Sequence, residues 1–126
     1  MFFTENELNA IAKIGLEMAK SDGRVDEVEL LVIKDKLTCF GIIEPSAIIG
    51  NAYKMDSLEA LVTVSKMEFE KKKYMAAFLG VVMAADGIID DSEIKMWTLT
   101  TSLCNLPSMT IEEAKDIIND IEQKNR

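Results

Sequence analysis

One acidic phrase occurs twice in this chain of 126 residues. It begins at Asp22 as D-G-x-V-D-x-x-E, and 64 residues later it begins again at Asp86 as D-G-x-I-D-x-x-E. The two copies supply six carboxylates, those of Asp22, Asp26, Glu29, Asp86, Asp90 and Glu93. Carboxylate oxygens without His or Cys beside them suit hard cations such as Ca²⁺ or Mg²⁺. The six residues are therefore candidate metal ligands, and a divalent cation is the candidate cofactor.

Each copy matches the second half of an EF-hand calcium loop, up to its closing Glu. The first half does not match. Its early ligand positions would be Met18 and Lys20 in the first copy, and Val82 and Ala84 in the second. A calcium loop needs early carboxylates among its six to eight oxygen ligands. A complete EF-hand is therefore excluded, while half of its ligand set remains in each copy.

The same phrase has a purely structural interpretation, as a signal for helix ends. Its Gly can take positive φ and so suits the end of a helix. Its second Asp can cap the next helix, and the Glu three residues later completes the spacing of a capping box. Asp22 and Asp86 have no necessary capping role, since each precedes the Gly at a helix end, where a carboxylate is unfavourable against the negative end of the helix dipole. Both interpretations stay open, since a capping carboxylate keeps lone pairs for a cation.

The composition bounds the class of protein. The length is sufficient for one domain with a hydrophobic core of its own, and 48% of the residues are hydrophobic. A net charge of −8 argues against nucleic-acid partners and anionic membrane surfaces. The longest apolar run, 74–85, is shorter than the roughly 20 residues of a membrane span. We expect no direct membrane insertion and interpret this run as a buried central helix.

Several functional classes are excluded or disfavoured by residues that are missing. The chain has no His, which excludes Ser-His, Cys-His and di-iron sites as well as His-containing zinc sites. It also has no Gly-rich phosphate loop. We therefore expect no enzymatic activity. No signal peptide is evident, so we expect a cytoplasmic protein in which Cys39 and Cys104 are reduced thiols near helix ends.

Apolar residues recur at helical spacing in about seven segments, and no stretch alternates as a strand would. Capping boxes at Thr4, Asp56 and Thr110 start three of these helices, and two others are expected at about 27–40 and 70–85. The 64-residue offset also pairs Gly41 with Asn105, the two residue types that best tolerate a left-handed helix end. The sequence predicts an all-α single domain, 1–126, with internal repeats at about 7–54 and 71–118 joined by the fourth helix. Because the turns cap their own helices, no cofactor should be required for folding.

Two D-G-x-hydrophobic-D-x-x-E turns in a small, acidic, helical chain resemble the TerB-like family, named for tellurite-resistance proteins. This family also includes the N-terminal domain of a membrane-anchored DnaJ-like co-chaperone. The resemblance covers the chain from about residue 7 to residue 121. It implies a pseudo-symmetric bundle of about seven helices, a role in stress or tellurite response, and a divalent-metal site at the six carboxylates of the turns.

Two functions follow, and they are compatible. The first is a cation-binding stress module built on the paired acidic turns. The second is a protein-interaction scaffold, in which the acidic turns serve only as helix caps. Eight methionines and the apolar surface around Met96 and Trp97 would then form an adaptable groove for a partner protein.

Overall fold

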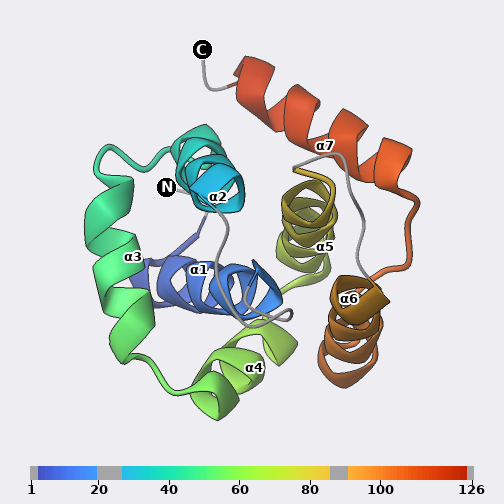
Figure 1. Cartoon of the computed structure of the whole chain (residues 1–126), viewed down its shortest axis with the longest axis horizontal. Coiled ribbons are helices and arrows are strands. Elements are labelled where there is room, and N and C mark those ends of the chain that lie inside the picture. Colours follow the sequence, from blue (N-terminus) through green and yellow to red (C-terminus); the bar gives the residue numbers. More distant parts are fainter. Residues whose placement is uncertain (1–2, 20–26, 86–90, 125–126) are drawn as a thin grey trace.

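The computed structural model describes residues 3–19, 27–85 and 91–124, which form seven helices and no strand. The helices are α1 (Glu5–Ala19), α2 (Glu27–Cys39), α3 (Pro45–Lys54), α4 (Ser57–Ser65), α5 (Phe69–Met83), α6 (Asp91–Cys104) and α7 (Ile111–Lys124). Figure 1 shows α1 and α5 in the interior, with the other helices around them. The predicted all-α single domain is confirmed. In the described ranges, no helix is both long enough and apolar enough to cross a membrane.

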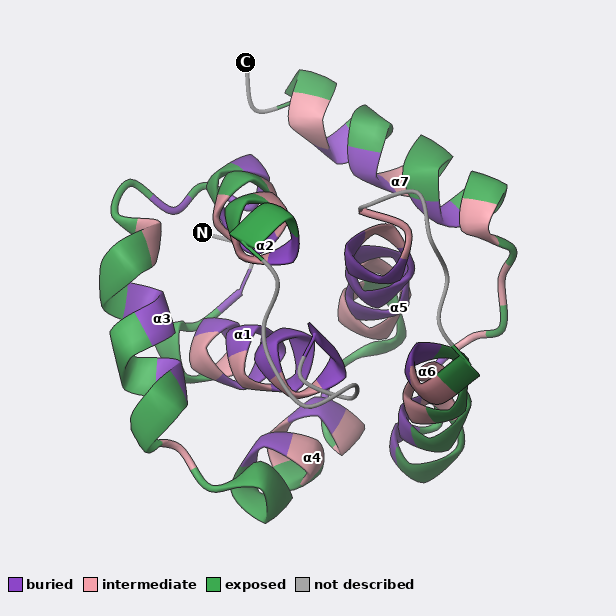
Figure 2. Cartoon of the chain, in the orientation of Figure 1, coloured by how far each residue is buried: buried purple, intermediate pink, exposed green. Residues whose placement is uncertain are grey.

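The core is organised around α5, as expected from the apolar run. Every residue from Met75 to Gly80 is buried, and α5 packs against α1, α2, α6 and α7. A helix that is apolar around its circumference needs neighbours on all sides. Figure 2 shows this burial on α5, whereas α3 and α7 each bury one face and expose the other. The helix spans Phe69–Met83 instead of the expected 70–85.

The predicted helix starts that fall on described residues are present. The side chains of Thr4 and Glu7 each accept a hydrogen bond from the other residue's backbone N–H, at 3.1 and 2.8 Å. The same exchange starts α7, where Thr110 and Glu113 bond at 3.1 and 3.0 Å. At α4, the Asp56 carboxylate accepts from the backbone N–H three residues later at 3.4 Å. These caps satisfy N–H groups that a helix leaves unpaired.

The two halves of the chain show matching local features. Within the described ranges, Gly41 and Asn105 are the residues with positive φ, at 92° and 54°. They follow the ends of α2 and α6, as the 64-residue offset predicts. In addition, α1 packs against α2 and α3, while α5 packs against α6 and α7. Internal duplication remains a prediction, which these correspondences support.

A largely buried ion pair joins the two halves. The Lys71 ammonium on α5 lies 2.8 Å from the Glu7 carboxylate on α1, and the two side chains are 15% and 16% exposed. In the run Lys71-Lys72-Lys73, charge alone predicts a solvated helix face, but the Lys71 side chain is largely buried, which corrects that prediction. Burial raises the pKa of Glu7. Hydrogen bonds from Lys71 and Thr4, together with the positive charge of Lys71, lower this pKa by more than burial raises it. The net result is a pKa below its ordinary value.

This ion pair should make part of the stability sensitive to acid. A carboxylate whose pKa is depressed by folding stabilises the native state above its unfolded pKa, and this stabilisation is lost as the pH falls through the folded pKa. Between about pH 5 and pH 3, the parent should therefore lose more free energy of unfolding than Glu7→Gln does. Gln preserves the capping box, so the comparison isolates the charge. Urea unfolding at several pH values measures the difference, and parallel curves would show that the pair contributes nothing.

Candidate functional site

The helix ends that flank the two acidic turns lie on one side of the molecule. Figure 1 shows the starts of α2 and α6 facing the viewer, with the ends of α1 and α5 close by in projection. Both α1 and α5 pack against both α2 and α6, so the four helices whose ends Figure 1 shows on this face are neighbours. We call it the acidic face and define it by the first turns of α2 and α6. The fold thus places the acidic first turns of α2 and α6, which are distant in sequence, on the same side.

Two of the six predicted ligands are placed by the structure. Glu29 lies in the first turn of α2 and Glu93 in the first turn of α6, so they occupy equivalent positions. The other four residues, Asp22, Asp26, Asp86 and Asp90, lie outside the described residues. Within the described ranges, no group of three or more His, Cys, Asp or Glu residues is arranged to hold a metal ion. A site at this face therefore needs carboxylates from the aspartates.

Burial distinguishes these two glutamates from the other acidic residues. Glu29 is 3% exposed and Glu93 is 5% exposed, and they are the buried charged residues of the described part of the chain. A buried carboxylate is costly unless hydrogen bonds or opposite charge offset the loss of water. The positive ends of the α2 and α6 dipoles supply part of this compensation.

A capping role alone does not explain this burial. Glu113 stands at the same position of a complete capping box on α7, yet its side chain is exposed. The equivalent Glu59 of α4 is exposed as well. Glu29 shares the buried side of α2 with Ile33 and Leu37, and Glu93 shares the buried side of α6 with Thr100 and Cys104. Helix capping and burial are thus separate properties, and only the first follows from the phrase itself.

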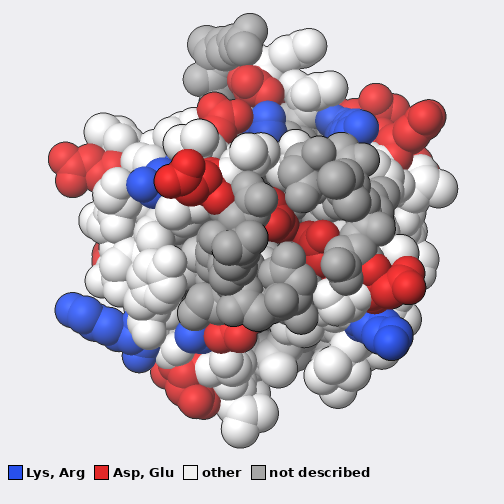
Figure 3. All heavy atoms as spheres, in the orientation of Figure 1, with Lys and Arg blue, Asp and Glu red and all other residues white. Residues whose placement is uncertain are grey.

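The charge distribution on this side favours cations. Figure 3 shows Asp and Glu side chains in the middle of the face and the described Lys side chains mainly toward its edges. The cysteine thiols are remote from it along the chain, since Cys39 ends α2 and Cys104 ends α6. Both are free and buried. The available ligands at the helix starts are therefore oxygen atoms, the type that Ca²⁺ and Mg²⁺ prefer.

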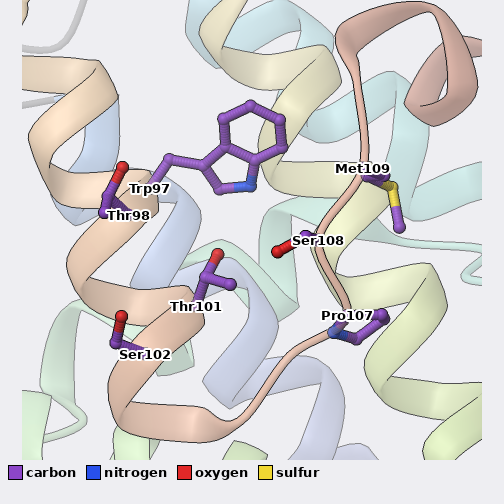
Figure 4. A pocket seen from close by; sticks show the side chains of 7 residues that line it. All are labelled: Trp97, Thr98, Thr101, Ser102, Pro107, Ser108 and Met109. Carbon is purple, nitrogen blue, oxygen red and sulfur yellow. The ribbon is translucent and has the colours of Figure 1, made fainter.

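A second feature, which the sequence did not predict, is a hollow of about 240 Å³ between α6 and the segment 105–110 (Figure 4). Its lining combines hydroxyl groups with one aromatic and two further apolar residues: Trp97, Thr98, Thr101, Ser102, Pro107, Ser108 and Met109. The signal in the sequence was a set of hydroxyl residues at helical spacing on α6. That pattern alone is also typical of a solvated helix surface.

Comparison with solved structures identifies a relative. The crystal structure of the protein of unknown function PG1108 from Porphyromonas gingivalis W83 is 36% identical, with a TM-score of 0.86. The alignment covers 95% of this chain and 98% of that chain. The chain belongs to the same family as this Porphyromonas protein. Searches of protein-family models and of curated proteins returned no match. Since the Porphyromonas protein is itself of unknown function, the relationship establishes the fold and not an activity.

Proposed function

We propose that this protein is a non-enzymatic, TerB-like stress-response module that binds a divalent cation at the acidic face. The observation that carries this proposal is the burial of Glu29 and Glu93 at equivalent helix starts. Carboxylates that crowd one region raise one another's pKa values unless a positive charge offsets the repulsion. A shared cation would neutralise several of them at once. The aspartates of the two turns would complete its oxygen ligands.

The chemistry of this face selects the class of cation. The chain contains no His, and its thiols lie at the opposite ends of α2 and α6. Soft and borderline metals prefer such nitrogen and sulfur ligands. Oxygen-only sites favour Ca²⁺ or Mg²⁺, which bind carboxylates together with carbonyl groups and water. The proposed ligand is therefore a hard divalent cation.

The test is a titration with CaCl₂ and MgCl₂ followed residue by residue by NMR. We expect saturable shifts concentrated in residues 20–30 and 86–94. The double variant Asp22→Asn/Asp86→Asn should bind about tenfold or more weakly, the usual scale for disturbing a metal site. The control Glu112→Gln/Asp116→Asn removes the same charge from exposed positions of α7 and should leave binding unchanged. If neither cation produces saturable shifts at millimolar concentration, helix capping is a sufficient explanation of the turns.

The stress-response part of the proposal is supported by the TerB-like resemblance of the doubled turns. It calls for a separate experiment in cells. A host that lacks the gene should survive potassium tellurite less well than its parent, and the wild-type gene should restore survival. Restoration by the Asp22→Asn/Asp86→Asn gene to the same level would separate the stress role from the acidic turns.

A protein-interaction role is the second candidate, and exposed leucine and valine side chains favour it. Leu58 and Val62 on α4 are 70% and 49% exposed, and Leu99 and Leu103 on α6 are 54% and 59% exposed. The two helices pack against each other. The sequence instead pointed to an apolar surface around Met96 and Trp97, but both of these side chains are partly buried against the core.

The interaction role is tested by crosslinking in cells followed by mass spectrometry. A partner that contacts α6 should be recovered with the parent and lost with Leu99→Glu/Leu103→Glu. The control Ile43→Glu changes an apolar residue that is 93% exposed outside these two helices, and it should retain the partner. Recovery of the same proteins with all three chains would argue against a docking surface on α6.

A further inference from the structure

The hollow beside α6 contains a buried polar group that the protein leaves without a partner. The Trp97 indole N–H is shielded from solvent and makes no hydrogen bond. Buried Trp N–H groups usually find an acceptor. Leaving one unpaired has an appreciable energetic cost, because its hydrogen bond to water is lost on folding. An acceptor that enters the hollow would recover this lost interaction.

The orientation of this N–H is set by packing on the other side of the ring. A Cβ atom placed on Gly80 would lie 3.3 Å from Cζ2 of Trp97 and 3.6 Å from Cη2, so the six-membered ring lies over the α5 backbone. Figure 4 shows the five-membered ring, with its nitrogen, turned toward the space beside Thr101 and Ser108. The donor is thus held in place before any ligand arrives, which reduces the entropic cost of binding.

The remaining lining defines the class of ligand. The hydroxyls of Thr101 and Ser108 can each donate and accept, and Pro107 and Met109 supply apolar contact. Among the residues that the structure describes, none that lines the hollow carries a charge, so an ion would have no counter-charge from them. The volume of about 240 Å³ lies below the roughly 300–1,000 Å³ of sites for drug-sized ligands. The ligand is therefore small, uncharged and partly apolar.

We propose that this hollow binds a small uncharged molecule whose carbonyl or amide oxygen accepts a hydrogen bond from the Trp97 indole. The hydroxyls of Thr101 and Ser108 bind the polar end of the same group. Because the nitrogen is shielded, side chains at the rim must rotate to admit the acceptor. Ser108 and Met109 lie on the non-helical segment between α6 and α7, where such rotation requires no change in a helix. Glu29 and Glu93, the two carboxylates of the acidic turns that the structure describes, do not line this site.

Three probes of similar shape test the proposal: benzamide, which carries a neutral acceptor, benzoate, which is anionic, and toluene, which has no acceptor. Trp97 is the single tryptophan of the chain, so its indole N–H gives one resonance in a ¹⁵N–¹H spectrum. We expect benzamide to move this resonance downfield and to saturate at millimolar concentration. Benzoate and toluene should bind more weakly.

Matched variants identify the groups that bind. Thr101→Val and Ser108→Ala should each weaken benzamide binding by about threefold to tenfold, the loss of one neutral hydrogen bond. Thr38→Val and Ser46→Ala are the controls, because they remove exposed hydroxyls on α2 and α3 that do not line the hollow. These controls should bind like the parent. An indole resonance that no probe moves, equal binding of toluene or benzoate, or equal binding by all four variants would overturn the proposal.

Discussion

Replacing Phe78 with Ala should lower the free energy of unfolding by about 3–5 kcal/mol, the range for removing a buried aromatic side chain. Phe78 is fully buried on α5. Its ring lies against α1, where a Cβ on Gly15 would be 2.9 Å from Cε1, and its centroid is 5.9 Å from that of Phe40. The substitution therefore opens a cavity among three segments that are distant in sequence, and rigid helices cannot close it. Urea unfolding monitored by circular dichroism measures the loss.

The same substitution at the start of α5 is the control for this result. Phe69 is 65% exposed, so Phe69→Ala removes little buried area and should change stability by no more than about 0.5 kcal/mol. The pair separates the effect of burial from that of the residue type. Equal losses at the two positions would contradict the central placement of α5.

Replacing Gly80 with Ala should destabilise the protein by about 1–3 kcal/mol, although Ala is the better helix former. An added Cβ would lie 2.9 Å from the Ala114 Cβ on α7 and 3.3 Å from the Trp97 ring. The Ala114 side chain has no rotatable group that could move aside. Relief of the clash therefore requires α7 to move away from α5. The fluorescence of the single tryptophan should change as well, which gives a local readout beside the unfolding curve.

Gly50 offers the matched control for this substitution. It lies within α3 and has no atom within 4 Å of an added Cβ. Gly50→Ala should therefore stabilise the protein by about 0.5–1 kcal/mol, because it restricts the unfolded chain without creating a clash. Opposite signs at Gly80 and Gly50 are the expected outcome. A stabilised Gly80→Ala variant would show that the α5–α7 contact is looser than the structure indicates.

Most of the fold could be predicted because its signals are local. Capping boxes at Thr4, Asp56 and Thr110 mark helix starts by a few side-chain contacts, and these contacts are present. The end of α2 at Cys39 differs by one residue from the expected 27–40. The bounds of α5 were less accurate. No Pro or Gly marks the break before it, so the start at Phe69 depends on packing, which a sequence pattern does not specify.

The candidate site could be predicted only in part, because burial depends on which face of each helix meets its neighbours. The helical spacing of α2 predicts a stripe of Leu30, Ile33, Leu37 and Phe40, and the last three of these are buried. The buried residue that this stripe omits is Glu29, which continues the line through Ile33 and Leu37. Each of these three residues lies four positions after the one before it, so helical spacing did contain the signal that Glu29 shares the buried face of α2. It was obscured because Glu is ordinarily assigned to the solvent side. The hollow beside Trp97 was not predictable in this way, since the non-helical segment 105–110 supplies part of its wall.

The Glu7–Lys71 pair has a consequence for the history of the chain. The two residues occupy equivalent positions of the predicted repeats and meet across the junction of α1 and α5. In a homodimer of a single ancestral unit, a position near the symmetry axis would face its own copy, Glu against Glu or Lys against Lys. Such like charges repel. An attractive Glu–Lys contact between equivalent positions could arise only after gene fusion let the two copies mutate independently. If the halves derive from one unit, this ion pair therefore post-dates their joining.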